Sequence, residues 1–246
     1  MGNIFTKNKK INDLHIITYN YNNSNLQYSK NILNNFINKY DDNDNIICIQ
    51  GLRDIDLNLD NKKYFFVNEL GLLIITNLEI VKTQYSVFNT IEYDNINSYK
   101  YGFQKLNLNY LNINFCIYNL ELIPNSIDEF NLNEIRENEM IELITFICNN
   151  INEDKIHIVT GCFYDMTKNF DELINISKIT NIITNLKTCN QESYIFFYSS
   201  NLIKNIDNLN DYIFNKFNIE VISHKIYNLN IGVHCPFETI LRLKEN

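Results

Sequence analysis

Short runs of apolar residues, separated by turns rich in Asn and Asp, recur along almost the whole chain. Most of these runs are too short for a helix and are rich in Ile, Phe, Tyr and Val, which is typical of β-strands buried on at least one face. The runs predict strands at Leu14–Asn20, Ile46–Gln50, Lys63–Asn68, Gly71–Thr76, Ile80–Phe88, Tyr99–Asn109, Leu111–Leu122, Lys155–Thr160, Ser193–Ser199, Glu220–Tyr227 and Pro236–Leu243.

Two longer segments have the spacing of helices instead. Ser29–Tyr40 begins with a residue that can cap a helix, and its apolar residues fall on one face. Asn131–Ile151 carries Glu residues near its start, where the helix dipole favours them, and a longer apolar stripe. A further short helix is expected within Phe170–Ile176. The stripe of the longest helix is made of Ile135, Met140, Ile141, Ile144, Ile147 and Cys148.

Strands interrupted by two helical stretches predict an α/β (α+β) fold in which two β-sheets form a sandwich flanked by helices. A chain of 246 residues with 45% hydrophobic content can bury one large core. Residues 1–12 are expected to form a flexible polar leader. Residues 13–246 are expected to form one domain, because no change in composition marks a linker and no period marks repeats.

The charge of the chain disfavours polyanionic partners. The formal net charge is −8, and the only arginines are Arg53, Arg136 and Arg242, whereas nonspecific nucleic-acid binding relies on Lys and Arg that neutralise phosphates. Nucleic acid is therefore not an expected partner. The six cysteines form no Cys-x-x-Cys pair and no secretory segment precedes the first strand, which predicts reduced thiols and a cytoplasmic location.

The amino terminus carries a possible lipidation signal. Met1–Thr6 fits the N-myristoylation pattern Met-Gly-x-x-x-Ser/Thr, and Lys7, Lys9 and Lys10 follow at once. One acyl chain binds membranes weakly, but an acyl chain together with a basic patch gives stable anchoring to an anionic leaflet. We therefore expect Gly2 to be acylated and the protein to lie on the cytosolic face of a membrane. The alternative is a polar leader that fits the pattern by chance.

Five short segments carry the candidate chemistry: Ile16–Asn20, Ile46–Gly51, Tyr118–Leu122, Val159–Tyr164 and Gly232–Pro236. Their order and spacing resemble the endonuclease/exonuclease/phosphatase superfamily, which has the DNase I-like fold. Members of that family read approximately as WN, QE, nTHL, GDFN and SDHxP at these five points. The resemblance spans residues 13–243 and implies metal-assisted hydrolysis of phosphate esters in active relatives.

The resemblance also implies how the first three segments depart from active relatives. Asn20 and Gln50 match the family, but Gly51 stands where the metal-binding Glu is found and offers no ligand. Mg²⁺ prefers carboxylate and water oxygens, so this loss removes the main metal ligand. In the third segment, Glu121 stands in the place of the family's His.

The last two segments have lost further groups. Cys162 and Tyr164 replace the Asp and Asn of the fourth segment, and Val233 replaces the Asp beside His234 in the fifth. Ser193 stands where an Asp often precedes a late strand. Only Asn20 and His234 clearly keep their chemical identity, and the loss of several members of one catalytic unit leaves little activity. We expect no bound cofactor or metal, with Mg²⁺ as the ion of any residual activity.

These substitutions predict a catalytically inactive protein that serves as a structural or binding module with an unidentified protein partner. Rich use of Asn and Ile, with Lys preferred to Arg, is typical of AT-rich genomes such as those of some large DNA viruses and some protists; a viral source would imply a virion-associated role. One alternative is a divergent metal-dependent phosphoesterase acting on phosphoinositides, other phospholipid headgroups or nucleotides. Another is a module that binds a phosphorylated small molecule without cleaving it.

A new chemistry in place of the old one is a further alternative. Cys162, Cys235, His234 and Glu121 would converge if the fold is right, and a thiol beside an imidazole can act as a nucleophile or a zinc ligand. Free cysteines are more often small apolar fillers, which is the interpretation that we favour. The nearby acids Asp54, Asp56 and Asp165 are expected to be solvated or to point away from the site.

Overall fold

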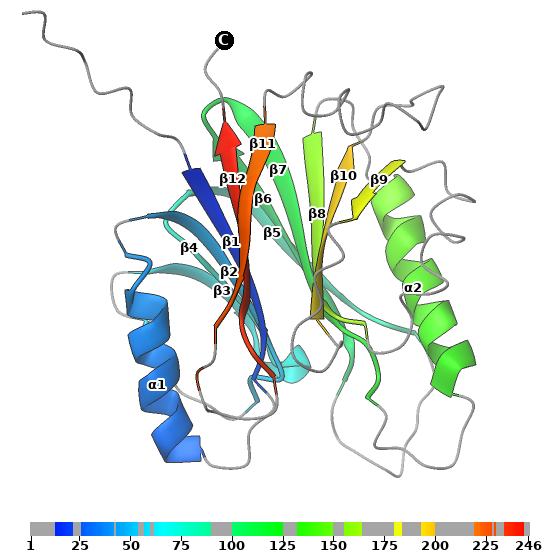
Figure 1. The fold of residues 1–246 in the computed structure, drawn as a ribbon. Coiled ribbons are helices and arrows are strands. Elements are labelled where there is room, and N and C mark those ends of the chain that lie inside the picture. Colours follow the sequence, from blue (N-terminus) through cyan, green and yellow to red (C-terminus); the bar gives the residue numbers. More distant parts are fainter. Residues whose placement is uncertain are drawn as a thin grey trace, which may run out of the picture.

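The structure of the protein is a computed structural model that describes residues 13–21, 26–41, 43–53, 57–59, 62–89, 100–124, 132–149, 155–163, 180–183, 193–199, 219–227, 229 and 234–243. The strands of this part of the chain form two sheets of six strands each. The sheets pack face to face, and one helix lies on the outer face of each (Figure 1). The two-sheet sandwich with flanking helices that the sequence predicts is therefore confirmed.

The first sheet contains the amino-terminal strands and the last two strands of the chain. Its central pair is parallel, and every other neighbouring pair in it is antiparallel. Across the sheet, the order is β11 (Ile219–Ile226), β12 (Phe237–Leu243), β1 (Asp13–Asn20), β2 (Asp44–Gln50), β4 (Leu72–Thr76) and β3 (Lys63–Val67).

The second sheet repeats this plan with the middle strands of the chain. Again one central pair is parallel and its neighbours are antiparallel. The order is β5 (Glu79–Val87), β6 (Gly102–Tyr110), β7 (Ile113–Glu121), β8 (Lys155–Cys162), β10 (Ser193–Ser199) and β9 (Thr180–Ile183).

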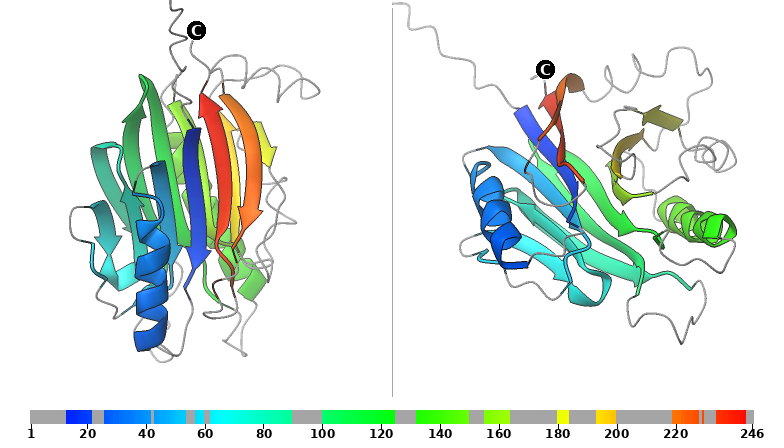
Figure 2. Two further views of the ribbon diagram at one scale, coloured as in Figure 1. Left: turned by 60° about the vertical axis from the view of Figure 1, so that its left-hand side comes forward. Right: turned by 60° about the horizontal axis from the view of Figure 1, so that its bottom comes forward.

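A helix joins the parallel pair of each sheet, because parallel neighbours need a crossover connection. Helix α1 (Leu26–Asn38) connects β1 to β2, and α2 (Leu132–Asn149) connects β7 to β8. Figure 2 shows the two helices on opposite outer faces of the sandwich. A short 3-10 helix, η1 (Asn68–Leu70), lies between β3 and β4. Within the described residues, neither α-helix is long and apolar enough to cross a membrane.

The alternation of side chains along the central strands divides the core into three layers. On β1, Leu14 and Ile16 face the second sheet, whereas Ile17 and Tyr19 pack under α1. The layer under α2 is built in the same way from the outward-facing residues of β7 and β8. The central strands are buried on both faces, which explains why their sequences are nearly continuous apolar runs. Their few inward-facing polar residues are therefore conspicuous.

Two details differ from the sequence-based expectations, and a third expectation is not tested. Strand β9 was not expected, since its four residues give too short a pattern to recognise. The strands expected at Tyr99–Asn109 and Leu111–Leu122 are joined by a two-residue turn at Leu111 and Asn112, so Leu111 belongs to the turn and not to the second strand; both turn residues have positive φ angles, as hairpin turns of this length require. The short helix expected within Phe170–Ile176 lies outside the described residues.

The apolar stripe that the sequence predicts for α2 is wrong at one position. Ile141 is 46% exposed, whereas Arg136 and Glu139 are buried. These two residues hold the backbone of Ile123, the segment that follows β7. The Arg136 Nε donates to the Ile123 carbonyl at 2.8 Å, and the Glu139 carboxylate accepts from the Ile123 amide at 3.1 Å. Two charged residues on the inner face of α2 therefore anchor the exit of β7.

Candidate functional site

The inward-facing polar residues gather where the central strands end. Parallel strands carry their carboxyl ends at the same edge of a sheet, and β1 pairs with β2 so that Asn20 lies opposite Gln50. In the second sheet, β7 pairs with β8 so that Glu121 lies opposite Cys162. The central strands of the two sheets contact each other across the sandwich. The fold thus brings the ends of four of the five sequence segments together.

Beneath these ends lies a buried layer of hydrogen-bonded side chains, made of Thr18, Gln50, Asn119 and Cys162 and called the polar layer below. All four are 0% exposed. The Gln50 amide nitrogen donates to Asn119 Oδ1 at 2.6 Å and to Thr18 Oγ1 at 3.1 Å. The Asn119 amide nitrogen in turn donates to the carbonyls of Ile49 and Leu73 at 3.0 and 3.2 Å. Since buried amides without partners are costly, this network holds the two sheets in register.

The Cys162 thiol belongs to this layer. Its Sγ lies 3.8 Å from Gln50 Oε1, to which it donates a hydrogen bond. Below it, burial raises the pKa of the Cys48 thiol to about 12. Cys48 and Cys162 are free thiols that have no access to solvent. A catalytic cysteine needs a thiolate in a partly exposed, electropositive place, so neither thiol has the surroundings of a nucleophile.

At the outer edge of the layer, Glu121 forms a buried ion pair with Arg53. Glu121 ends β7, and Arg53 follows β2; the Arg53 Nη2 lies 3.1 Å from Glu121 Oε2. The side chains of Arg53 and Glu121 are 16% and 7% exposed, respectively. Burial raises the pKa of Glu121 to about 7, and the Arg53 charge and a hydrogen bond from the Gly51 amide keep it from rising further.

Arg53 is held in place by two other parts of the chain, around residues 70–71 and 100–101. Its Nη2 lies 3.5 Å from the Leu70 carbonyl and 3.4 Å from the Lys100 carbonyl. The guanidinium carbon lies 5.2 Å from the centre of the Tyr101 ring, in the range of a cation–π contact. At Gly71, a Cβ would lie 2.7 Å from Arg53 Cγ, so glycine leaves room for the arginine.

The other positions singled out in the sequence are described to different extents. Asn20 is buried at the end of β1, and His234 is buried before β12, where burial lowers its pKa. Gly51 has a φ of 70°, a left-handed conformation that favours glycine. Ser193 is placed only by its backbone, which pairs with Cys162. The positions outside the described residues are Gly2, Asp54, Asp56, Tyr164, Asp165 and Val233.

Cys235 corrects one expectation. It is disulfide-bonded, although the sequence predicted reduced thiols throughout. A thiol held in a disulfide is not a metal ligand or a nucleophile. The alternative in which Cys162, Cys235, His234 and Glu121 form a thiol or zinc site therefore loses one of its members.

Comparison of the sequence with models of known protein families finds no match, and comparison with curated proteins also finds none. The structure, by contrast, matches solved structures over almost its whole length. D. rerio TDP2 complexed with a single strand DNA product has a TM-score of 0.65 at 10% identity, with 93% of this chain and 98% of that chain covered. An endonuclease/exonuclease/phosphatase from Bacteroides vulgatus has a TM-score of 0.63 at 13% identity, with 94% and 99% covered.

A third match is sphingomyelinase C from Streptomyces griseocarneus, with a TM-score of 0.57 at 11% identity and with 94% and 99% of the two chains covered. This chain has the DNase I-like fold. At such low identities the likeness concerns the fold, so the chemistry of this DNase I-like protein must be argued from its own residues.

The described residues of this DNase I-like fold do not fit a divalent cation at the ends of β2 and β7. Gly51 has no side chain, and the thiol of Cys162 faces Gln50 instead of the edge of the layer. The carboxylate that is present, on Glu121, already has Arg53 as its charge partner. Among the described residues, no group of three or more His, Cys, Asp or Glu side chains gathers to hold a metal. We therefore derive no metal-dependent step.

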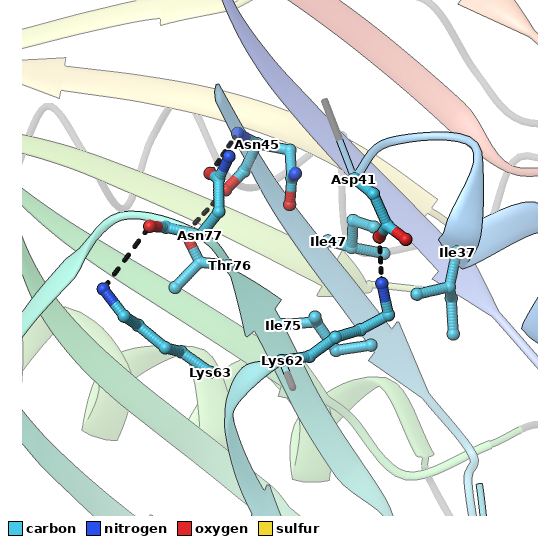
Figure 3. A pocket seen from close by; sticks show the side chains of 9 residues that line it. All are labelled: Ile37, Asp41, Asn45, Ile47, Lys62, Lys63, Ile75, Thr76 and Asn77. Carbon is cyan, nitrogen blue, oxygen red and sulfur yellow. Dashed lines mark hydrogen bonds and ion pairs between the residues drawn. The ribbon is translucent and has the colours of Figure 1, made fainter. Parts of the chain in front are cut away.

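A pocket of about 460 Å³ lies at the other end of β2, away from the polar layer. Its floor is formed by Ile37, Ile47 and Ile75, and polar residues form its rim (Figure 3). Several rim groups bind each other: Lys62 is paired with Asp41, the Lys63 ammonium donates to the Asn77 carbonyl, and the Thr76 hydroxyl donates to the Asn45 carbonyl. The pocket contains none of the positions singled out in the sequence.

Sequence reasoning missed two residues that organise the DNase I-like site. Arg53 was noted only as one of three arginines, and Asn119 only as part of a motif. The position of Arg53, two residues after Gly51 at the end of a buried strand, was the available signal. Asn119 could have been noticed as a polar residue in the middle of an apolar strand, since such residues need a partner.

Proposed function

We propose that this protein is a catalytically inactive member of the DNase I-like superfamily that serves as a binding or structural module. The observation that carries the proposal is the buried pair of Arg53 and Glu121 at the ends of β2 and β7. Within the described residues, the positive charge of Arg53 and the glycine at position 51 leave this edge without a free carboxylate. Hydrolysis of phosphate esters by a metal needs such carboxylates to fix the ion.

The fold remains intact beneath the altered residues. The polar layer is fully buried and hydrogen-bonded. The substitutions at Gly51 and Cys162 are therefore compatible with a packed core. A protein that keeps its fold and loses its chemistry retains surfaces and a stable scaffold, which is what a binding module uses.

We place this module at the cytosolic face of a membrane, through acylated Gly2 and the adjacent lysines Lys7, Lys9 and Lys10. Two such signals are needed for stable anchoring, and the sequence offers both. If the rich use of Asn and Ile reflects the AT-rich genome of a large DNA virus, the membrane is that of the infected cell or of the virion. The disulfide at Cys235 is unusual for a reducing compartment. Both assays described below are therefore performed with and without a reductant.

Catalysis is tested with the wild-type protein and with His234→Ala, using DNA, RNA, phosphoinositides, sphingomyelin and a generic phosphodiester in the presence of Mg²⁺ or Mn²⁺. The expected result is that both proteins hydrolyse every substrate at the rate of buffer alone. Turnover by the wild type that His234→Ala abolishes would establish a divergent phosphoesterase instead. His234 is the matched control because the resemblance assigns it to the reaction and it is buried before β12.

Membrane anchoring is tested by co-sedimentation with vesicles that contain phosphatidylserine. The full chain is produced together with an N-myristoyltransferase, and Gly2→Ala is the control. The wild type is expected to sediment with anionic vesicles and to stay in solution with neutral ones, whereas Gly2→Ala stays in solution with both. A wild type that carries no acyl group, or that ignores the vesicles, contradicts the anchoring proposal and leaves the catalytic one standing.

A further inference from the structure

The pocket near the start of β2 is apolar at its base. Ile37 of α1, Ile47 of β2 and Ile75 of β4 form its floor (Figure 3). Its volume of about 460 Å³ is within the range of about 300–1,000 Å³ that is typical of sites for small organic ligands. The alkyl chain of Lys62 adds apolar surface, because this side chain is 13% exposed while its ammonium group pairs with Asp41. The pocket therefore offers an apolar surface of ligand size beside the end of α1.

The polar side chains of the rim already bind one another or the backbone. The Asn45 amide nitrogen donates to the Tyr40 and Asn43 carbonyls at 2.7 and 2.8 Å. The Asn77 amide nitrogen donates to the Asn43 carbonyl at 2.6 Å, and its oxygen accepts from the Asn45 backbone amide at 3.0 Å. The Thr76 hydroxyl donates to the Asn45 carbonyl at 2.6 Å. A polar ligand would have to displace these bonds, whereas a hydrocarbon chain would not, so the pocket favours an apolar ligand.

The amino-terminal leader joins the domain beside this pocket. Strand β1 begins at Asp13, and its residue His15 lies opposite Asn45, which lines the pocket. Neighbouring strands are about 5 Å apart. The 11 residues from Gly2 to Asn12 span up to about 40 Å when extended. An acyl group on Gly2 can therefore reach the pocket of its own chain.

We propose that the acyl group of Gly2 occupies this pocket when the protein is away from a membrane, so that the leader and the pocket form a switch between a free and a membrane-bound state. This inference rests on the proposed acylation of Gly2 and adds its regulation. A neutral bilayer offers the acyl chain only hydrocarbon, and one acyl chain binds it weakly. An anionic bilayer also attracts the lysines of the leader. The pocket therefore retains the acyl chain until an anionic surface is present.

Lys62 covers the floor of the pocket and can uncover it at low cost. Figure 3 shows Lys62 reaching past Ile75 to Asp41, and the three floor isoleucines are 1–2% exposed. The Asp41 side chain is 55% exposed, and an ion pair so accessible to water adds little stability. Movement of Lys62 away from Asp41 would open the floor to the acyl chain.

The first experiment detects the acyl chain in the pocket without any change to the pocket. Isoleucine methyl resonances of the acylated wild type and of Gly2→Ala are compared by nuclear magnetic resonance in the absence of lipid. The methyl groups of Ile37, Ile47 and Ile75 are expected to shift between the two proteins. Those of Ile16 and Ile74, which pack between the two sheets, are the internal control and are expected to stay in place. Floor resonances that are identical in Gly2→Ala and in a wild type whose acylation is confirmed by mass overturn the proposal.

The source of the acyl chain is tested with sodium myristate. Added to Gly2→Ala, it is expected to shift the same three floor resonances, because the pocket of this variant is free to take a hydrocarbon chain. The acylated wild type is expected not to respond, since its own chain fills the pocket. An acylated wild type that responds as Gly2→Ala does means that the pocket takes a fatty acid from solution, which overturns the proposed switch.

A second variant tests the effect on membrane binding. Ile37→Phe places a larger side chain in the pocket, and Ile32→Phe is the matched control, because Ile32 also lies on α1 and packs in the same core layer but does not line the pocket. With its acyl chain displaced, acylated Ile37→Phe is expected to bind neutral vesicles about fivefold more than the wild type does. Ile32→Phe is expected to match the wild type. A folded Ile37→Phe whose binding stays within about twofold of the wild type contradicts the switch, and the resonance comparison remains decisive if this variant does not fold.

The outcomes separate this inference from the proposed anchoring. An acylated wild type that sediments with anionic vesicles but shows no shift at the floor refutes the switch and leaves the anchor standing. An acylated wild type that shows the shift but ignores every vesicle refutes the anchor and leaves the acyl pocket standing. A wild type that carries no acyl group refutes both, and its mass identifies that case.

Discussion

Substitution of Glu121 by Gln should change how the stability of this protein depends on pH. Burial raises the pKa of Glu121 from its ordinary value of 4.5 to about 7. In the folded state Glu121 keeps its proton up to about pH 7, whereas the unfolded chain releases it near pH 4.5. The folded state is therefore favoured below pH 4.5, and this contribution is lost as pH rises through 7. A shift of this size corresponds to about 3 kcal/mol.

The Glu121→Gln variant is itself the control for this prediction. The amide introduced by Glu121→Gln would still accept hydrogen bonds from the Gly51 amide and from Arg53 but would not titrate, so the difference in stability between wild type and variant isolates one group. Urea unfolding followed by circular dichroism, at intervals of about one pH unit from roughly 4.5 to 8, measures that difference. The wild type is expected to lose about 3 kcal/mol relative to the variant across this range.

A difference that stays constant with pH would refute the reasoning. It would mean that the Arg53 charge and the Gly51 hydrogen bond balance the effect of burial, so that the pKa of Glu121 is the same in the folded and unfolded states. A difference that grows in the opposite direction, with the wild type gaining stability as pH rises, would mean that the folded pKa lies below the ordinary value of 4.5 and that the two residues form a strong ion pair.

Two further predictions concern residues away from this pair. Gly161 has a φ of 144°, and a Cβ there would lie 2.1 Å from the Leu120 carbonyl oxygen, so Gly161→Ala should lower the free energy of unfolding by about 3 kcal/mol; a loss below about 0.5 kcal/mol in urea unfolding would contradict the geometry. Burial alone would raise the pKa of Glu238, but hydrogen bonds from His15 and Tyr227 hold it below its usual range. The stability from Glu238 is therefore present above the ordinary pKa of 4.5 and lost as pH falls, and Glu238→Gln should flatten the acid side of the stability curve, which unfolding at roughly pH 3 to 6 checks.

The fold could be predicted from the sequence because its central strands are buried on both faces. Such strands read as apolar runs with sharp boundaries, and the expected Ile46–Gln50 and Lys155–Thr160 fall within β2 and β8. The order of strands in the sheets could not be obtained in this way, because local patterns do not say which runs are neighbours. The resemblance to a known superfamily supplied the overall fold, and the likeness to solved structures confirms it.

The site was predicted less completely, for a physical reason. The sequence identified positions where groups are missing, such as Gly51 and Cys162, because an absence can be seen within one motif. It did not identify Arg53 as the partner of Glu121, because the two residues are far apart in the chain and meet only when β2 and β7 pack across the sandwich. An interaction between loops at the ends of different sheets leaves no periodic signal in the sequence.

The residues that match active relatives are therefore weak evidence for activity. Gln50 lies in the polar layer at 0% exposure, bonded to Asn119 and Thr18. Replacing it would leave buried amide and hydroxyl groups without partners, at a cost of about 1–3 kcal/mol each. Folding stability alone is enough to require this residue, whatever the protein does. Catalysis would instead require groups at the outer edge of the layer, and there the chain has a glycine and an arginine–glutamate pair.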